Sequence, residues 1–464
     1  MFDQPPSFLT AQFIVSVIVL LVVVHVILIT VAYSIYLERK ISAYIQDRIG
    51  PNRVGFDFGL PGLRFLRGAL GLGQPLADGI KFLLKEDYTP QRVDKALFTL
   101  APLVIIVPAL IGFAVIPWGG VVEVGNFKLL GWVLEDGLFG WTIKGGPVHV
   151  AGAAVDVGVI YLLAVASLGV YGVTLGGWAS NNKYSFLGGL RSTAQMLAYE
   201  IPLGLSLLAV LLVYGTVRPE SIVYYQANYG WMVLAQPMAA VLFFTAILAE
   251  ANRAPFDNAE AEQELVGGYH TEYSSMRFAL FFLAEYAHMI TSSAFFALLF
   301  LGGYHLPLIP WLAPEETTLL AGFLKFLVFF GKVVLLVCFM MVIRWTLPRM
   351  RFDQVMMMAW QAAIPLALVV VVVTAFMVYF GLTPTFSGGP EGHGLGLVPL
   401  LVVNLLMGAG VVLIYPLLPR YNPNRKIALY GSRFNPVPGE AVSTRPVDPM
   451  ALEDRPVEGT LAPR

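Results

Sequence analysis

The sequence predicts an all-α, polytopic membrane protein with nine transmembrane helices, and three observations support this fold class. Hydrophobic residues make up 57% of the 464 residues, whereas charged residues make up only 13%; a soluble domain carries roughly 25%. Nine segments are long and apolar enough to cross a bilayer, which takes ~20 residues. Lys and Arg are concentrated in every second segment between these spans, as expected for a chain that crosses a membrane repeatedly.

The predicted spans are 13–37, 96–122, 157–182, 192–215, 231–249, 278–303, 319–343, 354–380 and 397–418. Six contain no Asp, Glu, Lys or Arg, and the other three contain Glu200, Glu285, and Lys325 with Lys332. The first apolar segment is too long for the core of a signal peptide and has no basic leader, so we expect it to be a retained helix.

The distribution of basic residues predicts the orientation of the chain. Of the 29 Lys and Arg residues, 24 follow odd-numbered spans and three follow even-numbered spans. Because loops on the cytoplasmic side are enriched in Lys and Arg, the amino terminus is predicted outside and the carboxyl terminus in the cytoplasm.

The segments outside the spans differ in character. Residues 60–86, in the loop after the first span, mix Leu, Ile and Phe with charges, which predicts amphipathic surface helices. Residues 1–418 are predicted to form a single transmembrane domain. Residues 419–464 are polar and rich in Pro, which predicts a disordered cytoplasmic tail.

The composition excludes several kinds of chemistry. The net charge is −1, which gives no indication of a nucleic-acid partner. The single cysteine, Cys338, excludes an internal disulfide and a self-contained iron–sulfur cluster. The six histidines have no metal-ligand spacing along a helix, so no metal site is predicted. Any electron transfer would therefore use cofactors on other subunits.

Charged residues within the apolar spans are the strongest functional signal. Glu200 and Glu285 lie inside spans and Glu250 ends the fifth. An ionisable group in the hydrocarbon region costs a few kcal/mol, so such groups face a protein interior or water and usually serve function. A single glutamate could instead bond a neighbouring helix. With Lys325 and Lys332 at similar depth, we interpret these residues as one buried proton route, and we expect Arg253 to pair with Glu250.

The loop after the fifth span is unusually acidic for the cytoplasmic side. Residues 250–277 contain six carboxylates against Arg253 and Arg277. Glu260 and Glu264 would share a face if the segment were helical. A solvated run of charges is the alternative. Because Leu265, Val266 and two glycines follow directly, we expect part of the loop to be buried against a partner.

Five motifs together resemble one family of membrane proteins. They are ERKISAYIQDRIGPNRVG (38–55), QPLADGIKFLLKED (74–87), GWASNNKYSFLGGLRS (177–192), RAPFDNAEAEQELVGGYHTEYSSMRFALFFLAEY (253–286) and IRWTLPRMRFDQ (343–354). The chain from about 13 to 418 resembles the H-subunit family of bacterial NADH–quinone oxidoreductase, respiratory complex I, which is homologous to mitochondrial NADH dehydrogenase subunit 1.

The resemblance implies a membrane subunit, in the bacterial inner membrane, that forms much of the quinone chamber and couples quinone reduction to proton translocation. Quinone is then the substrate. FMN and iron–sulfur clusters lie on partner subunits, and the partners are the hydrophilic quinone-site subunits, small membrane subunits and lipids.

The resemblance also implies roles for particular residues. The quinone-binding residues it implies are Glu38, Arg39, Arg48, Phe278 and Arg344. The proton-coupling residues it implies are Asp78, Glu200, Glu250, Asp257, Glu260, Glu262, Glu264, Glu285 and Tyr286. The alternative for the arginines is anchoring to lipid headgroups.

The chain departs from the family pattern in places. Some relatives have a carboxylate where this chain has Ser167, and Lys332 and His25 have no counterpart that we expect. Two alternative functions stay open from the sequence: the homologous anchor subunit of a membrane-bound hydrogenase complex, and an independent ion transporter.

Overall fold

The computed structural model describes residues 10–56, 68, 70–129, 141–307, 309–384 and 396–414. The predicted tail at 419–464 and part of the predicted amphipathic segment lie outside this range. The chain divides into two units, residues 1–408 and 409–464. The second unit contributes only the end of α14 to the described residues, and the site lies wholly in the first.

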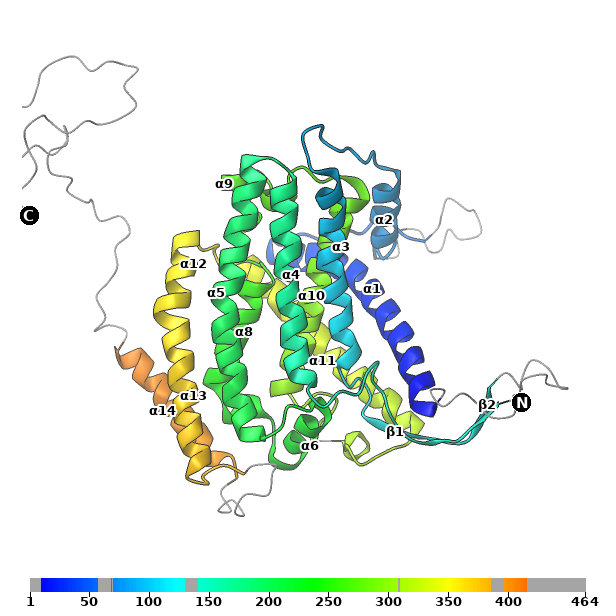
Figure 1. Ribbon diagram of the computed structural model, residues 1–464, viewed down its shortest axis with the longest axis vertical. Coiled ribbons are helices and arrows are strands. Elements are labelled where there is room, and N and C mark those ends of the chain that lie inside the picture. Colours follow the sequence, from blue (N-terminus) through cyan, green and yellow to red (C-terminus); the bar gives the residue numbers. More distant parts are fainter. Residues whose placement is uncertain are drawn as a thin grey trace, which may run out of the picture. The chain divides into compact units, whose positions relative to one another are not determined.

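The described part of the chain is mostly helical (Figure 1). The longer helices are α1 (Ala11–Ile45), α3 (Lys95–Ile111), α4 (Gly158–Ala179), α5 (Lys183–Tyr214), α10 (Ser275–Phe300), α11 (Leu319–Thr346), α13 (Ile364–Tyr379) and α14 (Val398–Ile414). The shorter ones are α2 (Gln74–Leu84), α6 (Pro219–Tyr229), α7 (Met232–Ala235), α8 (Pro237–Glu250), α9 (Glu262–Leu265) and α12 (Phe352–Met358). Within these ranges, seven helices are long and apolar enough to cross a membrane.

Several helices extend beyond the apolar segments that predicted them. Helix α1 continues past residue 37 to Ile45, and α5 begins at Lys183 rather than at 192. The side chain of Asn182 caps α5 by accepting from the backbone N–H of Tyr184, and that of Thr10 caps α1. Hydropathy identifies only the part of a helix that is apolar enough to lie among lipid chains. Backbone hydrogen bonds continue the helix beyond that part into polar sequence. This extension places Glu38 on a helix.

The all-α prediction is wrong between α3 and α4. Two antiparallel pairs form there, β1 (Val121–Val124) with β4 (Gly146–His149) and β2 (Phe127–Leu129) with β3 (Trp141–Ile143). The predicted span at 96–122 is shorter as a helix, because α3 is followed by a 3-10 turn over Gly112–Val115. Pro117 and two glycines follow this turn, and they do not favour helix continuation.

The fifth predicted span is interrupted. Residues 231–249 form α7 and α8, with a break at Gln236 before Pro237, a residue that cannot donate a backbone hydrogen bond. The eighth span stays helical from Phe352 to Tyr379, with a π-helical turn over Ala359–Ala363 between α12 and α13.

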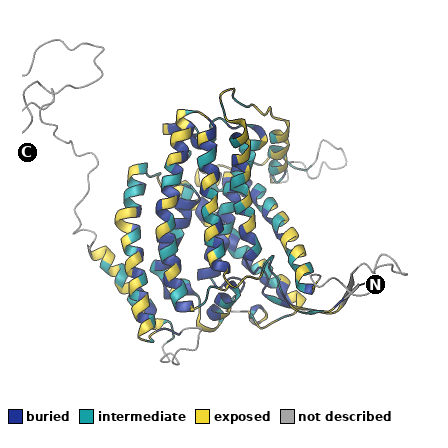
Figure 2. Ribbon diagram, viewed as in Figure 1, coloured by how far each residue is buried: buried dark blue, intermediate teal, exposed yellow. Residues whose placement is uncertain are grey.

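Helix α10 lies at the centre of the packing. It contacts α1, α3, α8 and α11. Of the residues in its most apolar stretch, 72% are buried, whereas the corresponding share for α1 is 17%. Figure 2 shows the exposed residues gathered on α1 and α13 and the buried ones on the helices between them. Polar side chains on α10 therefore face protein, where they need polar partners.

Candidate functional site

A buried glutamine shapes the loop between α8 and α10. Gln195 on α5 is fully buried. Its Nε2 donates to the carbonyls of Ala249 at 2.8 Å and Phe256 at 2.7 Å, and its Oε1 accepts from Asn258 at 3.1 Å. One side chain thus holds both ends of the turn that carries the acidic residues.

A glycine brings the second half of this loop against the first. Gly268 has φ +63°, and a Cβ there would lie 1.8 Å from the carbonyl oxygen of Ala259. Because only glycine tolerates this approach, the short 3-10 helix Gly268–His270 can pack on the acidic segment. His270 Nε2 consequently lies 3.2 Å from Glu260 Oε1.

Five side chains from three helices and the loop form a buried charge network. Glu38 on α1 accepts from Arg344 on α11 at 2.5 Å and from the hydroxyl of Tyr286 on α10. Arg253 lies between the two acids, with Nε 3.0 Å from Glu285 and Nη1 3.7 Å from Glu38. Its guanidinium is also 4.2 Å from the ring centroid of Tyr286. Two carboxylates and two guanidiniums thus balance in charge.

Two further acids in the loop, Asp257 and Glu260, have pKa values that are shifted in opposite directions. Burial, and then the charge of Glu260, raises the pKa of Asp257 to about 6. Burial alone would raise the pKa of Glu260 too, but the hydrogen bond to His270 and the charges of Arg253 and Arg344 lower it below its usual value.

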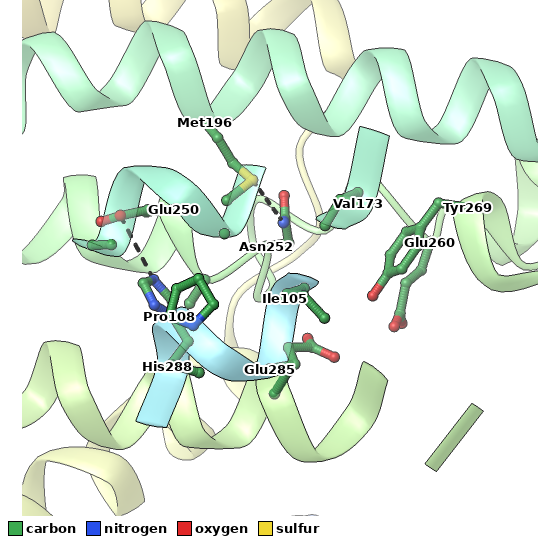
Figure 3. A pocket seen from close by; sticks show the side chains of 15 residues that line it. Ile105, Pro108, Val173, Met196, Glu250, Asn252, Glu260, Tyr269, Glu285 and His288 are labelled. Atoms are coloured by element: carbon green, nitrogen blue, oxygen red, sulfur yellow. Dashed lines mark hydrogen bonds and ion pairs between the residues drawn. The ribbon is translucent and has the colours of Figure 1, made fainter. Parts of the chain in front are cut away.

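A cavity lies against these residues, and its empty space, including its opening, is about 560 Å³. Glu250, Glu260 and Glu285 line it, with His288, Tyr269 and apolar residues of α3 and α4. In the view of Figure 3, Glu250 and His288 lie at one end and Glu260 and Tyr269 at the other, with Glu285 between them. About 40 Å³ of this space is open to the centre of a water molecule, so the cavity can hold water.

A second cavity continues from the first between α4, α5, α8 and α10, with an empty space of about 330 Å³. The two cavities share Glu250 and His288 in their linings. Near it, the hydroxyl of Ser167 on α4 donates to the carboxylate of Glu200 on α5. Glu200 is close enough to Glu250 for their charges to interact.

Other predicted site residues lie apart from this network. Asp78 on α2 pairs with Arg39 at 2.8 Å, and both are partly exposed. Arg48 is exposed and donates to Gln46.

Two more sequence-predicted residues also lie away from the buried charges. Phe278 packs in an aromatic cluster, with its ring centroid 4.6 Å from that of Phe282 and 5.2 Å from that of His270. Glu264 pairs with Arg191 at 2.5 Å. The side chain of Glu262 lies outside the described residues.

Two expected pairings differ in the structure. Glu250 does not pair with Arg253 but faces His288, whose Nε2 is 3.7 Å from its Oε1. Helix α8 ends at Glu250, so the spacing of a continuing helix does not apply to Arg253. Likewise, α9 begins only at Glu262, and Glu260 and Glu264 point to different partners.

The prediction that both lysines share the depth of the glutamates is wrong. Lys332 Nζ donates to the carbonyls of Leu301, Gly303 and His305 at 2.6, 2.8 and 2.7 Å, and Lys325 donates to that of Glu316 at 2.6 Å. These carbonyls follow the carboxyl end of α10, whereas Glu285 lies nearer its start. Helices α10 and α11 are antiparallel, so similar positions along them lie at different depths.

Sequence reasoning missed several polar residues of the site. Gln195 stands in an apolar span, and that alone could have marked it as a buried hydrogen-bonding residue. His288 is a different case: the sequence places it on the same helical face as Glu285, three positions further on, but predicts no role for it. Tyr269 and His270 had no local signal, because Gly268 alone brings them to the acidic segment.

The fold and the site together define a multi-pass membrane protein with an internal network of acids and arginines beside a cavity. A family model described as NADH dehydrogenase matches residues 18–375. The chain belongs to this NADH dehydrogenase family.

Similar proteins in three bacteria agree with this assignment, and each is named as an H subunit of NADH-quinone oxidoreductase. The chain is 45% identical to the second such subunit of Geobacter metallireducens over 368 residues, which cover 79% of this chain and 96% of the relative. It is 45% identical to the first one of Geobacter sulfurreducens over 358 residues, 77% of this chain and 93% of the relative. It is 41% identical to the first one of Cytophaga hutchinsonii over 364 residues, 78% and 96% respectively.

Proposed function

We propose that this chain is the membrane subunit of a proton-translocating NADH–quinone oxidoreductase, where it forms much of the quinone chamber and couples quinone reduction to proton movement. The proposal rests on a series of buried charged side chains that contact one another and end at a cavity. Glu38, Arg253 and Glu285 are in contact, and Glu285 lines a cavity that also reaches Glu250. Family membership supports the same activity.

Quinone binding is assigned to Glu38, Arg39, Arg48, Phe278 and Arg344. Arg344, which is partly exposed, pairs with the buried Glu38, and both side chains can exchange hydrogen bonds with a polar headgroup. Phe278 and its aromatic neighbours offer an apolar wall for a ring or a prenyl tail. Arg39 lies partly exposed beside α2, where a molecule arriving from lipid would pass.

Proton coupling is assigned to the acids on the far side of Arg253. A change of charge beside Glu38 alters the field at Arg253, and hence at Glu285, through contacts of 3.7 and 3.0 Å. Glu260 and Glu250 line the same cavity. Asp257 is close enough to Glu260, and Glu200 to Glu250, for their charges to interact. Asp78, Glu262, Glu264 and Tyr286 belong to the same proposed assignment.

The membrane arrangement is part of the proposal. Each of the nine predicted spans coincides, at least in part, with apolar helix in the described residues, including the short helices α8 and α14. The asymmetry of basic residues supports an outside amino terminus and a cytoplasmic carboxyl terminus. Membership of the family supports a location in the bacterial inner membrane. We further propose one transmembrane domain over 1–418, a disordered cytoplasmic tail, and FMN and iron–sulfur clusters on partner subunits.

The two alternatives have less support. The relatives named above are all subunits of NADH-quinone oxidoreductases, which does not favour the anchor subunit of a hydrogenase. An independent transporter would move protons after reconstitution of this chain alone, whereas the proposed subunit needs its partners for redox-driven movement.

The proposal is tested with the purified complex in liposomes. Glu285→Gln and Glu200→Gln should each reduce coupled quinone reduction about tenfold or more, because a neutral amide cannot carry a proton. Reduction of ferricyanide by NADH, which does not need the quinone chamber, should persist. Glu272→Gln is the matched control, because this acid bonds Asn182 away from the cavity. Normal coupled rates in both variants would remove the acids from the mechanism.

A further inference from the structure

His288 is not among the residues assigned to quinone binding or to proton coupling. It lies one turn beyond Glu285 on α10, and its Nε2 is buried, with no hydrogen-bond partner among the described residues. The nearest acidic atom is Glu250 Oε1, at 3.7 Å. A buried imidazole nitrogen without a bonded partner is costly, and it calls for an explanation.

The explanation comes from the two cavities. The larger one opens toward Glu285 and Glu260, and the smaller one continues between α4, α5, α8 and α10 toward Thr291 and Ser292. Their linings share only Ala166, Glu250 and His288 among the described residues. Alanine carries no exchangeable proton, so any proton crossing this common wall meets Glu250 or His288.

The chemistry of imidazole suits such a crossing. Its two nitrogens lie on opposite sides of the ring, and one can accept a proton while the other releases one. A separation of 3.7 Å is too long for a direct hydrogen bond, but one water can bridge it. Figure 3 shows the ring of His288 turned toward the carboxylate of Glu250 at one end of the larger cavity.

We propose that His288 is a proton carrier that links the two cavities, together with Glu250. This inference rests on the proposed function. The carboxyl of Glu250 gives its proton to Nε2 through water, which leaves a carboxylate and an imidazolium. Nδ1 then releases its proton to water in the second cavity, and proton exchange through water moves the remaining ring proton from Nε2 to Nδ1, so that Nε2 is again an acceptor. One proton enters from Glu250 and one leaves from the ring, after which Glu250 is reprotonated.

The test uses the assembled complex in liposomes, with protons translocated per NADH oxidised as the measured quantity. His288→Asn keeps a hydrogen-bonding side chain but cannot take up a proton, so it should lower proton translocation about tenfold or more. Ferricyanide reduction reports whether the complex has assembled. If H288N translocates protons as the unaltered complex does, the proposal is overturned.

A chemical rescue separates proton transfer from a structural role. His288→Ala leaves space beside Glu250, and added imidazole should restore part of the proton translocation. 1-Methylimidazole is the matched probe, because its methylated nitrogen cannot carry a proton, and it should restore much less. Equal restoration by both compounds, or none by imidazole in an assembled complex, would contradict the relay.

The same vesicles distinguish this inference from the function on which it rests. If E285Q loses coupling and H288N does not, only the role of His288 fails. If both variants couple normally, the proposed route through the buried acids fails as a whole. E272Q again serves as the control that should translocate protons normally, because its carboxylate does not line either cavity.

Discussion

Removal of Arg253 is the most direct test of the buried charge network. In Arg253→Met the side chain keeps its length and its apolar contacts but loses the guanidinium. Glu38 would retain Arg344 at 2.5 Å. Glu285 would lose the guanidinium contact at 3.0 Å, and its Oε2 already has no hydrogen-bond partner among the described residues. The variant thus leaves one buried carboxylate uncompensated.

The expected cost follows from that geometry. Only 4% of the Arg253 side chain is exposed, so solvent screens little of the interaction. Breaking a buried ion pair by removal of one partner costs about 3–5 kcal/mol, mostly because the other charge is left unpaired. Glu285→Gln should cost less, since Arg253 keeps Glu38 and the ring of Tyr286. In the double variant R253M/E285Q no unpaired acid remains, and about half or more of the loss should be recovered.

The midpoint of thermal inactivation of the purified complex measures these effects. R253M should lower the midpoint by several degrees, E285Q by less, and the double variant should lie above R253M. Ferricyanide reduction before heating checks that each complex has assembled. If the double variant loses the sum of the two single losses, the two residues are not coupled, and the network has been wrongly assigned.

Two further predictions use the same midpoint. Folding raises the pKa of Asp257 from its ordinary 3.8 to about 6. Between these two values the folded chain holds a proton that the unfolded chain has already released. The stabilisation from this proton is complete at low pH and is lost as the pH rises through about 6. Asp257→Asn stays neutral, so the midpoint of the unaltered complex should fall relative to that of D257N between about pH 4 and pH 6 and change little above that. Lys332→Met leaves three carbonyls beyond the end of α10 without their donor, at about 1–3 kcal/mol for each buried group left unpaired. It should lower the midpoint more than Lys325→Met, which frees only one carbonyl; an equal effect would contradict this.

Local physical rules predicted the helices and the burial of the acids. An apolar run of the right length has few other ways to satisfy its backbone in a bilayer, so apolar helix occurs at each predicted span. An acid in or beside such a run must turn toward protein. Glu250 is only 7% exposed, and the side chain of Glu285 only 11%. This reasoning needs no knowledge of which helices are neighbours.

The pairing of those acids could not be predicted in the same way. Tyr286 and Glu38 are 248 positions apart, so no local spacing reports their contact. The spacing of Glu250 and Arg253 predicts a pair only within a continuing helix, but the chain turns after Glu250. The lysines were misplaced for a related reason, since depth in a membrane depends on helix direction. Which side chains form pairs depends on how the helices pack against one another, so these pairs are found only in the assembled structure.

The packing also explains why the network can respond to a distant change. Arg253 contacts one acid from α1 and one from α10, and it is held by the loop rather than by either helix. A proton or an anion added near Glu38 changes the electric field at Arg253, which is 3.7 Å away, and hence at Glu285, 3.0 Å from the same guanidinium. In the proposed function, this change carries the chemical event at the quinone to the cavity where Glu250 and His288 lie. Without a cation shared by both acids, the two ends would be separate ion pairs, and a change at one would be largely neutralised locally.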